Sequence, residues 1–262
     1  MSDLLALPLT LSAVTASSAA TPAANLLDPK PGRVWQSTAT NATLTLDLGQ
    51  DLDIDLLWLG YTNLSRAATW EIRCATAAQG QSYLANAASI EQASTQAWAS
   101  DDALGPAYHA FWWRAGGPIS RRYVQVSLSD PTNADGVLRA GRVYLSRAYR
   151  PSWPREAGSE RGILDLSTKE RLRTGPLVIN PGARIKTRAV TFTGLAAEEM
   201  RTFFWPLLLS RGETGDFLHV IDPTPALGRH ELIIYGVLAR ARSIEIAAAN
   251  YQSIRLEIEE MA

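Results

Sequence analysis

Short segments in which polar and apolar residues alternate recur throughout this chain, and they constrain its fold more than any other feature. Residues 43–48 (TLTLDL) and 123–128 (YVQVSL) repeat with a period of two, so one face of each extended segment is apolar. Residues 56–59 (LLWL) form a continuous apolar run, which is typical of a strand covered on both faces. Glycine, proline, asparagine and aspartate separate these segments. The pattern predicts a β-sandwich or jelly roll with a first strand at 7–14.

A boundary is predicted near the middle of the chain. Residues 150–154 (RPSWP) place two prolines and a tryptophan between differently patterned halves. A chain of 262 residues is long enough for two domains of usual size. The predicted domains are therefore residues 1–150 and 151–262, both mainly β.

The second half is expected to combine strands with one flanking helix. Strands are expected at 184–193, 216–221, 231–246 and 251–259. Apolar residues recur at three- and four-residue intervals over 196–210, which predicts the helix. Gly212 is the expected C-terminal cap. Pro206 predicts a kink or an early end, because an interior proline removes a backbone hydrogen bond.

Charge and cysteine content limit the class of protein. The net charge is only −1, yet residues 121–188 contain 14 basic and 6 acidic residues. This band is either an ordinary solvated surface or a face that meets an acidic subunit or a nucleic acid. The single cysteine, Cys74, cannot form an internal disulfide and is expected to be a buried apolar residue. No apolar run approaches about 18 residues, so no membrane insertion is expected.

No set of catalytic residues stands out, and the protein is expected not to be an enzyme. The chain has three histidines, His109, His219 and His230, and no nucleophile-elbow motif. His219 lies in an apolar segment and is expected to be structural. One cysteine and scattered histidines offer no zinc site, and no phosphate-binding glycine motif is present. We predict no catalytic residue, metal or cofactor; a converging carboxylate pair for glycoside hydrolysis is the one alternative left open.

Aromatic residues are concentrated between residues 98 and 113. They are Trp98, Tyr108, His109, Phe111, Trp112 and Trp113, followed by Arg114. Aromatic faces stack on sugar rings, and arginine or histidine supplies hydrogen bonds. The candidate carbohydrate-binding residues are Tyr108, His109, Trp112, Trp113 and Arg114. The alternative is that alternate aromatics fill the sandwich core or a subunit contact.

The first half resembles discoidin-type, galactose-binding-like jelly rolls over most of residues 10–147. The resemblance lies in short segments: 22–28 (PAANLLD), 34–37 (VWQS), 44–49 (LTLDLG), 54–59 (IDLLWL) and 122–126 (RYVQV). It implies a galactose-binding-like jelly-roll sandwich. The cysteine pair that often joins the ends of extracellular members is absent.

The second half resembles the distal tail and tail-tube proteins of long-tailed bacteriophages over roughly residues 160–262. The resembling segments are 188–195 (RAVTFTGL), 215–220 (GDFLHV), 234–237 (IYGV) and 251–260 (YQSIRLEIEE). The resemblance implies a β-sandwich with one flanking helix whose sheets join side by side into rings. Its partners would be further copies in a hexamer or trimer and other tail-tube and tail-tip proteins, with genomic DNA only passing through the channel.

These resemblances lead to one main expectation and one alternative. The main expectation is a structural virion protein, a distal-tail-like adaptor in the phage tail tip or baseplate, assembled in the host cytoplasm and located in the virion tail. The alternative is a carbohydrate-binding module that contacts host glycans. The residues expected at the contact between copies are Arg184, Lys186, Arg188, Arg255, Glu257 and Glu259.

Overall fold

The computed structural model describes residues 3–97, 108–171, 173, 175–223, 229–240, 244–248 and 251–261. The protein is mainly β, as predicted, and divides into two compact units. The sandwich unit comprises residues 6–148 and 223–233. The C-terminal unit comprises residues 1–5, 149–222 and 234–262.

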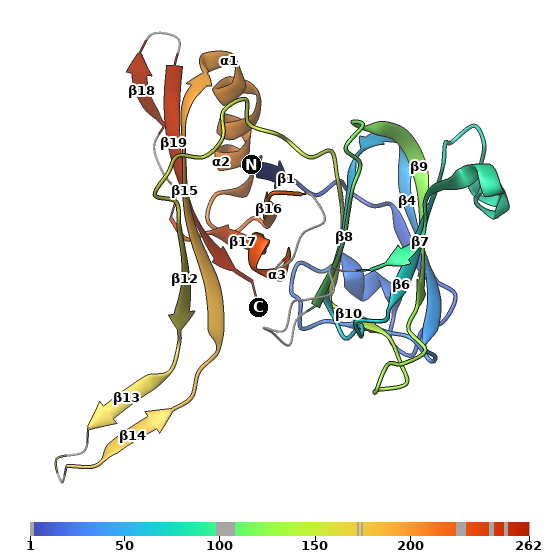
Figure 1. Cartoon of the computed structure of the whole chain (residues 1–262), viewed down its shortest axis with the longest axis horizontal. Helices are drawn as coiled ribbons and strands as arrows, with labels where there is room; N and C mark the ends of the chain where they lie inside the picture. The colour runs from blue at the N-terminus through green and yellow to red at the C-terminus, as the bar shows by residue number, and fades with distance from the viewer. Residues whose placement is uncertain are drawn as a thin grey trace. The chain divides into compact units, whose positions relative to one another are not determined.

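Two antiparallel sheets form the sandwich unit (Figure 1). The larger has the order β2 (Ala13–Ala16), β4 (Asn41–Ile54), β9 (Ile119–Ser129), β6 (Thr69–Ala75), β7 (Ile90–Gln96). The smaller has the order β11 (Arg142–Ser146), β5 (Leu56–Thr62), β8 (Tyr108–Trp113), and β10 (Arg139–Ala140) pairs with β3 (Trp35–Gln36). Short helical segments are η1 (Ala23–Leu27), η2 (Gln81–Ala85), η3 (Ala87–Ser89) and α3 (Arg229–Leu232). Five strands facing three make the jelly-roll sandwich that the sequence predicted.

The core of this unit follows from the sequence pattern. Leu44, Leu46 and Leu48 of β4 are buried while the residues between them are partly exposed, as period-two alternation requires. Residues 56–60 of β5 are all buried, so this strand is covered on both faces. Cys74 is also buried, and burial raises the pKa of its thiol to about 12. Its predicted role as an apolar core residue is confirmed.

One seven-stranded sheet forms the centre of the C-terminal unit. Its order is β1 (Asp3–Ala6), β16 (Phe217–Ile221), β17 (Ile233–Leu238), β19 (Tyr251–Glu260), β15 (Arg184–Ala196), β12 (Glu160–Asp165), with β18 (Glu245–Ala248) also paired to β19. A separate hairpin is formed by β13 (Thr168–Arg171) and β14 (Leu177–Asn180). The strand expected over 231–246 was wrong in extent, because its start is helical and β17 ends at Leu238.

The first strand corrects both a predicted element and a predicted boundary. No single strand covers residues 7–14, because β1 ends at Ala6 and β2 begins at Ala13. β1 joins the sheet of the C-terminal unit beside β16, whereas residues 1–150 were expected to form one domain. Leu5 and Tyr149 bond through their main chains, with N–O distances of 2.9 and 2.7 Å. The sandwich unit is therefore inserted after the first strand of the C-terminal unit.

The predicted helix consists of α1 (Ala197–Glu199), the π-helical η4 (Met200–Phe204) and α2 (Trp205–Arg211). Pro206 lies in the first turn of α2, directly after the π segment. The expected early end at Pro206 was wrong, because the helix continues from the π-helical turn through Pro206 to Arg211. Gly212 caps the helix, with φ +49° and its N–H donated to the carbonyl of Leu208. Its predicted capping role is confirmed.

Candidate functional site

A two-stranded extension of the central sheet is the most exposed element of the C-terminal unit. β12 pairs with β15, and the same two chain segments continue as the hairpin β13–β14 beyond the sheet (Figure 1). The N–H of Leu166 donates to the carbonyl of Ala183 at 2.9 Å and joins the two ladders. We name residues 163–180 the arm.

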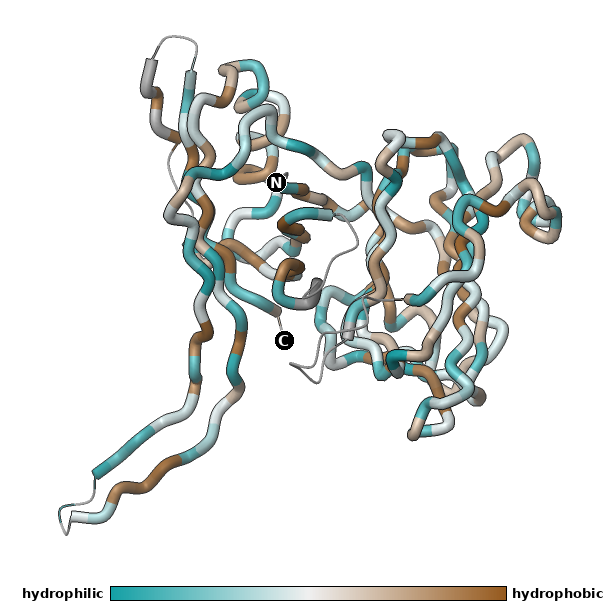
Figure 2. Tube along the Cα trace, in the orientation of Figure 1, coloured by the Kyte–Doolittle hydropathy of each residue, from teal (hydrophilic) through white to brown (hydrophobic). Residues whose placement is uncertain are grey.

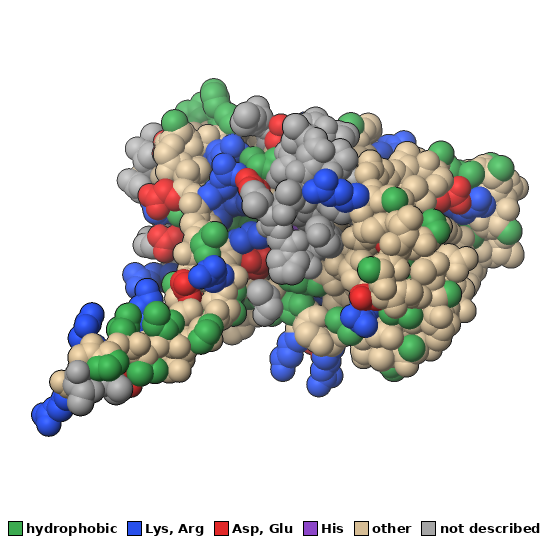
Figure 3. All heavy atoms as spheres, turned by 60° about the horizontal axis from the view of Figure 1, so that its bottom comes forward, with side chains coloured by type: hydrophobic (Ala, Val, Ile, Leu, Met, Phe, Trp, Pro, Cys, Tyr) green, Lys and Arg blue, Asp and Glu red, His purple; other side chains and the backbone are tan. Residues whose placement is uncertain are grey.

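The arm exposes large aliphatic side chains. They are Ile163, Leu164, Leu166, Leu177, Val178 and Ile179, between 39% and 72% exposed. Figure 2 shows the hydrophobic stretch along β14, and Figure 3 shows apolar side chains gathered over the arm with lysine and arginine near its tip. Charged or short edges normally protect such strands from unwanted pairing. A long apolar hairpin therefore marks a contact surface.

Local hydrogen bonds hold the arm at its root. Asp165 accepts from the N–H of Ser167 at 2.9 Å and forms an ion pair with Arg184 at 3.3 Å. The bonds from Ser167, together with Arg184, lower the pKa of Asp165 to about 2, so its carboxylate stays charged at neutral pH. Gly182 approaches Leu166 so closely that an added Cβ would lie 2.3 Å from the Leu166 carbonyl carbon. These contacts order a hairpin that would be marginally stable alone.

The register separates the six predicted interface residues into two groups. Thr187 pairs with Glu259 and Ala189 with Glu257, so Glu257 and Glu259 share a face with Arg255. Arg184, Lys186 and Arg188 lie on the opposite face because side chains alternate along β15. A single flat contact between copies can therefore include only one of these two groups of residues.

Arg188 is buried, which corrects its expected place at a contact between copies. Its Nη1 lies 3.3 Å from His219 Nδ1, and burial lowers the pKa of its guanidinium to about 10. His219 is also buried, as its predicted structural role requires, and Asp3 Oδ2 lies 3.9 Å from its Nε2. Arg188 therefore contributes to a polar cluster inside the unit.

The opposite face carries a shallow hollow of about 280 Å³ at the root of the arm. Its lining includes the small residues Gly162, Ala189 and Ala239, beside Glu160, Arg255 and Glu257. Arg255 and Glu257 form an ion pair at 3.3 Å. Their charges offset each other, so the hollow has no single sign of charge that would select an ion.

The aromatic segment chosen from the sequence mostly faces inward. His109 and Trp112 are buried, and Trp112 belongs to the core between the sheets. These two side chains therefore do not form an exposed platform for a sugar. Arg114 donates to the carbonyl of Gly117 at 2.8 Å and lies 3.7 Å from Glu91. Trp113 is partly exposed; Trp98 and the side chain of Tyr108 lie outside the described residues.

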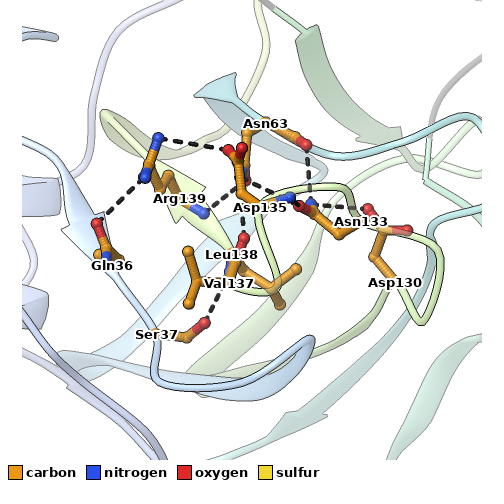
Figure 4. Close-up of polar contacts among 9 residues, drawn as sticks. All are labelled: Gln36, Ser37, Asn63, Asp130, Asn133, Asp135, Val137, Leu138 and Arg139. Atoms are coloured by element: carbon orange, nitrogen blue, oxygen red, sulfur yellow. Dashed lines mark hydrogen bonds and ion pairs between the residues drawn. The ribbon is translucent and has the colours of Figure 1, made fainter.

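A polar loop cluster that the sequence did not predict lies at one end of the sandwich (Figure 4). Buried Asp130 accepts from the N–H of Ser65 at 2.6 Å and from Asn133 Nδ2 at 3.0 Å. Asn63 Nδ2 donates to Asp135 Oδ2 and to the carbonyl of Val137, both at 2.9 Å. These bonds fix two loops far apart in sequence.

Arg139 lies on the outer side of this cluster. Its Nε donates to Gln36 Oε1 at 3.1 Å, and its Nη1 lies 3.4 Å from Asp135 Oδ2. Both members of the Arg139–Asp135 pair are nearly half exposed. The sequence offered a weak signal here, since asparagine and aspartate are frequent in turns whatever their function.

The described residues show no other feature of a known class of site. They contain no group of three or more histidine, cysteine, aspartate or glutamate residues placed to hold a metal ion. Among the helices that the structure describes, none is long and apolar enough to cross a bilayer.

Comparison with known proteins gives fold resemblances of low similarity. No family model matches the chain, and no curated protein matches its sequence. A carbohydrate-binding module of AlyQ, solved with 4,5-unsaturated mannuronic acid, is similar at 18% identity and a TM-score of 0.37, over 53% of this chain and 97% of that one. A Streptococcus pneumoniae fucose-binding module is similar at 15% identity and a TM-score of 0.35, over 54% and 96%.

A Ruminococcus gnavus fucosidase of glycoside hydrolase family 29 is similar at 8% identity and a TM-score of 0.38. The match covers 52% of this chain and only 25% of the fucosidase. Similarities at this level carry no conclusion about function. The strand order itself defines a mainly β protein in which a jelly-roll sandwich is inserted into a second β unit that bears an apolar arm.

Proposed function

We propose that this chain is a structural subunit that assembles with copies of itself into a closed ring. The observation that carries the proposal is the arm, with its six exposed aliphatic side chains. Exposed apolar surface of this kind is typical of sites that contact another protein. A repeated head-to-tail contact that closes on itself covers such a surface on every copy.

The setting we propose is the tail tip or baseplate of a long-tailed phage, where the subunit acts as a distal-tail-like adaptor. The sequence resemblance over residues 160–262 supports this setting. Other tail-tube and tail-tip proteins would then be its neighbours. Electron microscopy of purified particles labelled with an antibody to this chain tests the setting, and label confined to the tail tip is the expected result.

Self-assembly is tested by light scattering on the full chain. The wild type is expected to form one defined oligomer, visible as rings by negative stain. Replacing Leu177 and Ile179 together with aspartate places two charges on the apolar arm and is expected to yield monomers. The matched control is Ala78→Asp with Gln79→Asp, which adds the same charges to an exposed turn of the sandwich unit. A wild type that stays monomeric at tens of micromolar contradicts the proposal.

A second candidate function is glycan binding by the loop cluster around Arg139. The favouring observation is that Arg139, Asp135 and Gln36 form an ordered, exposed polar surface on a rigid scaffold. Arg139→Ala is expected to abolish retention on a glycan array without changing the melting temperature by more than a few degrees. If the wild type binds no glycan on the array, this candidate is rejected.

A further inference from the structure

A second exposed apolar surface lies on the helical segment 197–211. Trp205 is 51% exposed and Leu209 is 72% exposed. They are four residues apart, so they form one strip along the helix, with exposed Pro206 beside it. The inward face of the same segment carries buried side chains: Met200, Phe204 and Leu207.

Another side of this helical segment is also covered within the C-terminal unit. Tyr149 stacks on Phe203, with ring centroids 3.7 Å apart and planes 10° apart. Glu199 accepts from the N–H of Ser152 at 2.8 Å and from the hydroxyl of Tyr149. The chain before β12 therefore packs along the helix, and the strip of Trp205 and Leu209 is left facing outward.

Energetics indicate that whatever receives the arm must itself be apolar. Association costs translational and rotational freedom, and the burial of apolar surface must offset that cost. Only one face of the arm can enter a contact, because Leu177 and Ile179 lie opposite Val178 along β14. A polar receiving surface would add a desolvation penalty. An exposed tryptophan and leucine add the apolar area that a stable contact needs.

The arm and the strip cannot cover each other in one molecule. The arm precedes β15 in the chain and extends from the end of the strand that begins at Arg184. The helix begins directly after Ala196, the last residue of β15. A 13-residue strand spans roughly 40 Å at about 3.3 Å per residue. Each copy therefore offers one arm and one strip at opposite ends of a continuous strand. In an assembly of identical copies, there is then one strip for every arm.

Charge favours arm-to-helix contact over arm-to-arm contact. Lys169 pairs with Ile179 and Arg171 with Leu177, so both cations lie on the face of the arm that carries these apolar residues. Two such faces repel each other. The helical strip lies between Glu198, in the first turn and ion-paired with Arg201, and exposed Glu213, just beyond the end.

We propose that the helix strip of Trp205 and Leu209 receives the Leu177 and Ile179 face of the arm from the next copy. This inference rests on the self-assembly proposed above and specifies its geometry. The contact is heterologous, because each copy donates its arm on one side and receives an arm on the other. Such a contact closes into a ring when the rotation between copies divides a full turn.

Cysteine cross-linking of the full chain tests this pairing. The natural Cys74 is buried with a raised pKa, so it does not compete for the reagent. A variant with both Ile179→Cys and Leu209→Cys, treated with a short bis-maleimide, is expected to give a ladder of covalent multimers. Each single variant is expected to give monomer bands only. Dimers from Ile179→Cys alone would show arm-to-arm pairing and overturn the inference.

A charge variant gives an independent readout. Leu209→Lys places a cation opposite the basic arm and is expected to weaken self-association at least tenfold, with an unchanged circular dichroism spectrum. The matched control, Ala78→Lys, adds the same charge to the sandwich unit and is expected to leave association unchanged. If the wild type forms rings but Leu209→Lys associates normally, the strip is rejected while self-assembly stands. A monomeric wild type rejects both.

Discussion

The buried cluster of His219, Arg188 and Asp3 shows how individual residues depend on the fold around them. His219 lies between a guanidinium on β15 and a carboxylate on β1. Arg155 adds a second guanidinium, ion-paired with Asp3. Burial is the main reason that the pKa of His219 falls to about 4; Asp3 raises the pKa and Arg188 lowers it further. His219 is therefore neutral in the folded protein at neutral pH.

This arrangement makes the stability of the C-terminal unit depend on pH. An unfolded histidine titrates near 6.5, whereas folded His219 titrates near 4, so the unfolded state binds the proton first. The contribution of neutral His219 to the free energy of unfolding is complete above about pH 6.5. It falls by up to about 3 kcal/mol as the pH drops towards 4. Between pH 6.5 and 4, the free energy of unfolding of the His219→Gln variant is expected to fall less than that of the wild type.

Denaturant unfolding of both proteins at several pH values measures the effect. Because His109 and His230 are present in both, their contributions cancel in the difference between wild type and variant. Parallel pH profiles would show that His219 does not govern this dependence.

At the scale of the element, the helix shows how local chemistry overrides a simple rule. An interior proline was expected to kink the helix or end it early, yet the helix continues through the π segment and Pro206 to Arg211. The end is set instead by Gly212, whose φ of +49° and ψ of −138° suit glycine far better than residues with a Cβ. Gly212 could be identified from the sequence because its preference is local; the π segment could not.

Gly212→Ala tests the importance of this cap. The substitution is expected to destabilise the C-terminal unit by about 1–3 kcal/mol, because the backbone conformation is strained for alanine while no atom blocks the new methyl group closely. Ser210→Ala, at an exposed position two residues earlier, is the control and is expected to change stability by less than about 0.5 kcal/mol. Equal effects in thermal unfolding would contradict the capping argument.

At the scale of the whole molecule, the inserted topology makes the N-terminus part of the C-terminal unit. All four residues of β1 are buried. Asp3 forms an ion pair with Arg155, and Leu5 bonds to Tyr149 through its main chain. β1 thus covers one side of β16, at an edge of the sheet.

Deletion of residues 1–6 is therefore expected to destabilise the C-terminal unit by at least about 2 kcal/mol, since buried leucines are lost. Hydrogen exchange is expected to accelerate in β16, while the amides of β4 and β9 keep their protection. Deleting residues 1–2 alone, which leaves β1 intact, serves as the control. Faster exchange in both units would contradict the division described above.

The sequence by itself determined those features of the fold that depend only on residues close together in the chain. Alternation in β4 and the continuous apolar run in β5 predicted their burial, and helical spacing with Gly212 predicted the helix and its end. These signals are local because a strand or helix repeats its pattern over a few residues.

Only the tertiary structure decided which residues meet across the chain. It placed β1 beside β16, turned Trp112 and Arg188 inward, and joined Asn63 to the loop around Asp135. The apolar residues of β14 were visible in the sequence, flanked by Gly175-Pro176 and Pro181-Gly182, but their exposure was not. Burial depends on what the rest of the chain packs against a residue, and no local pattern contains that information.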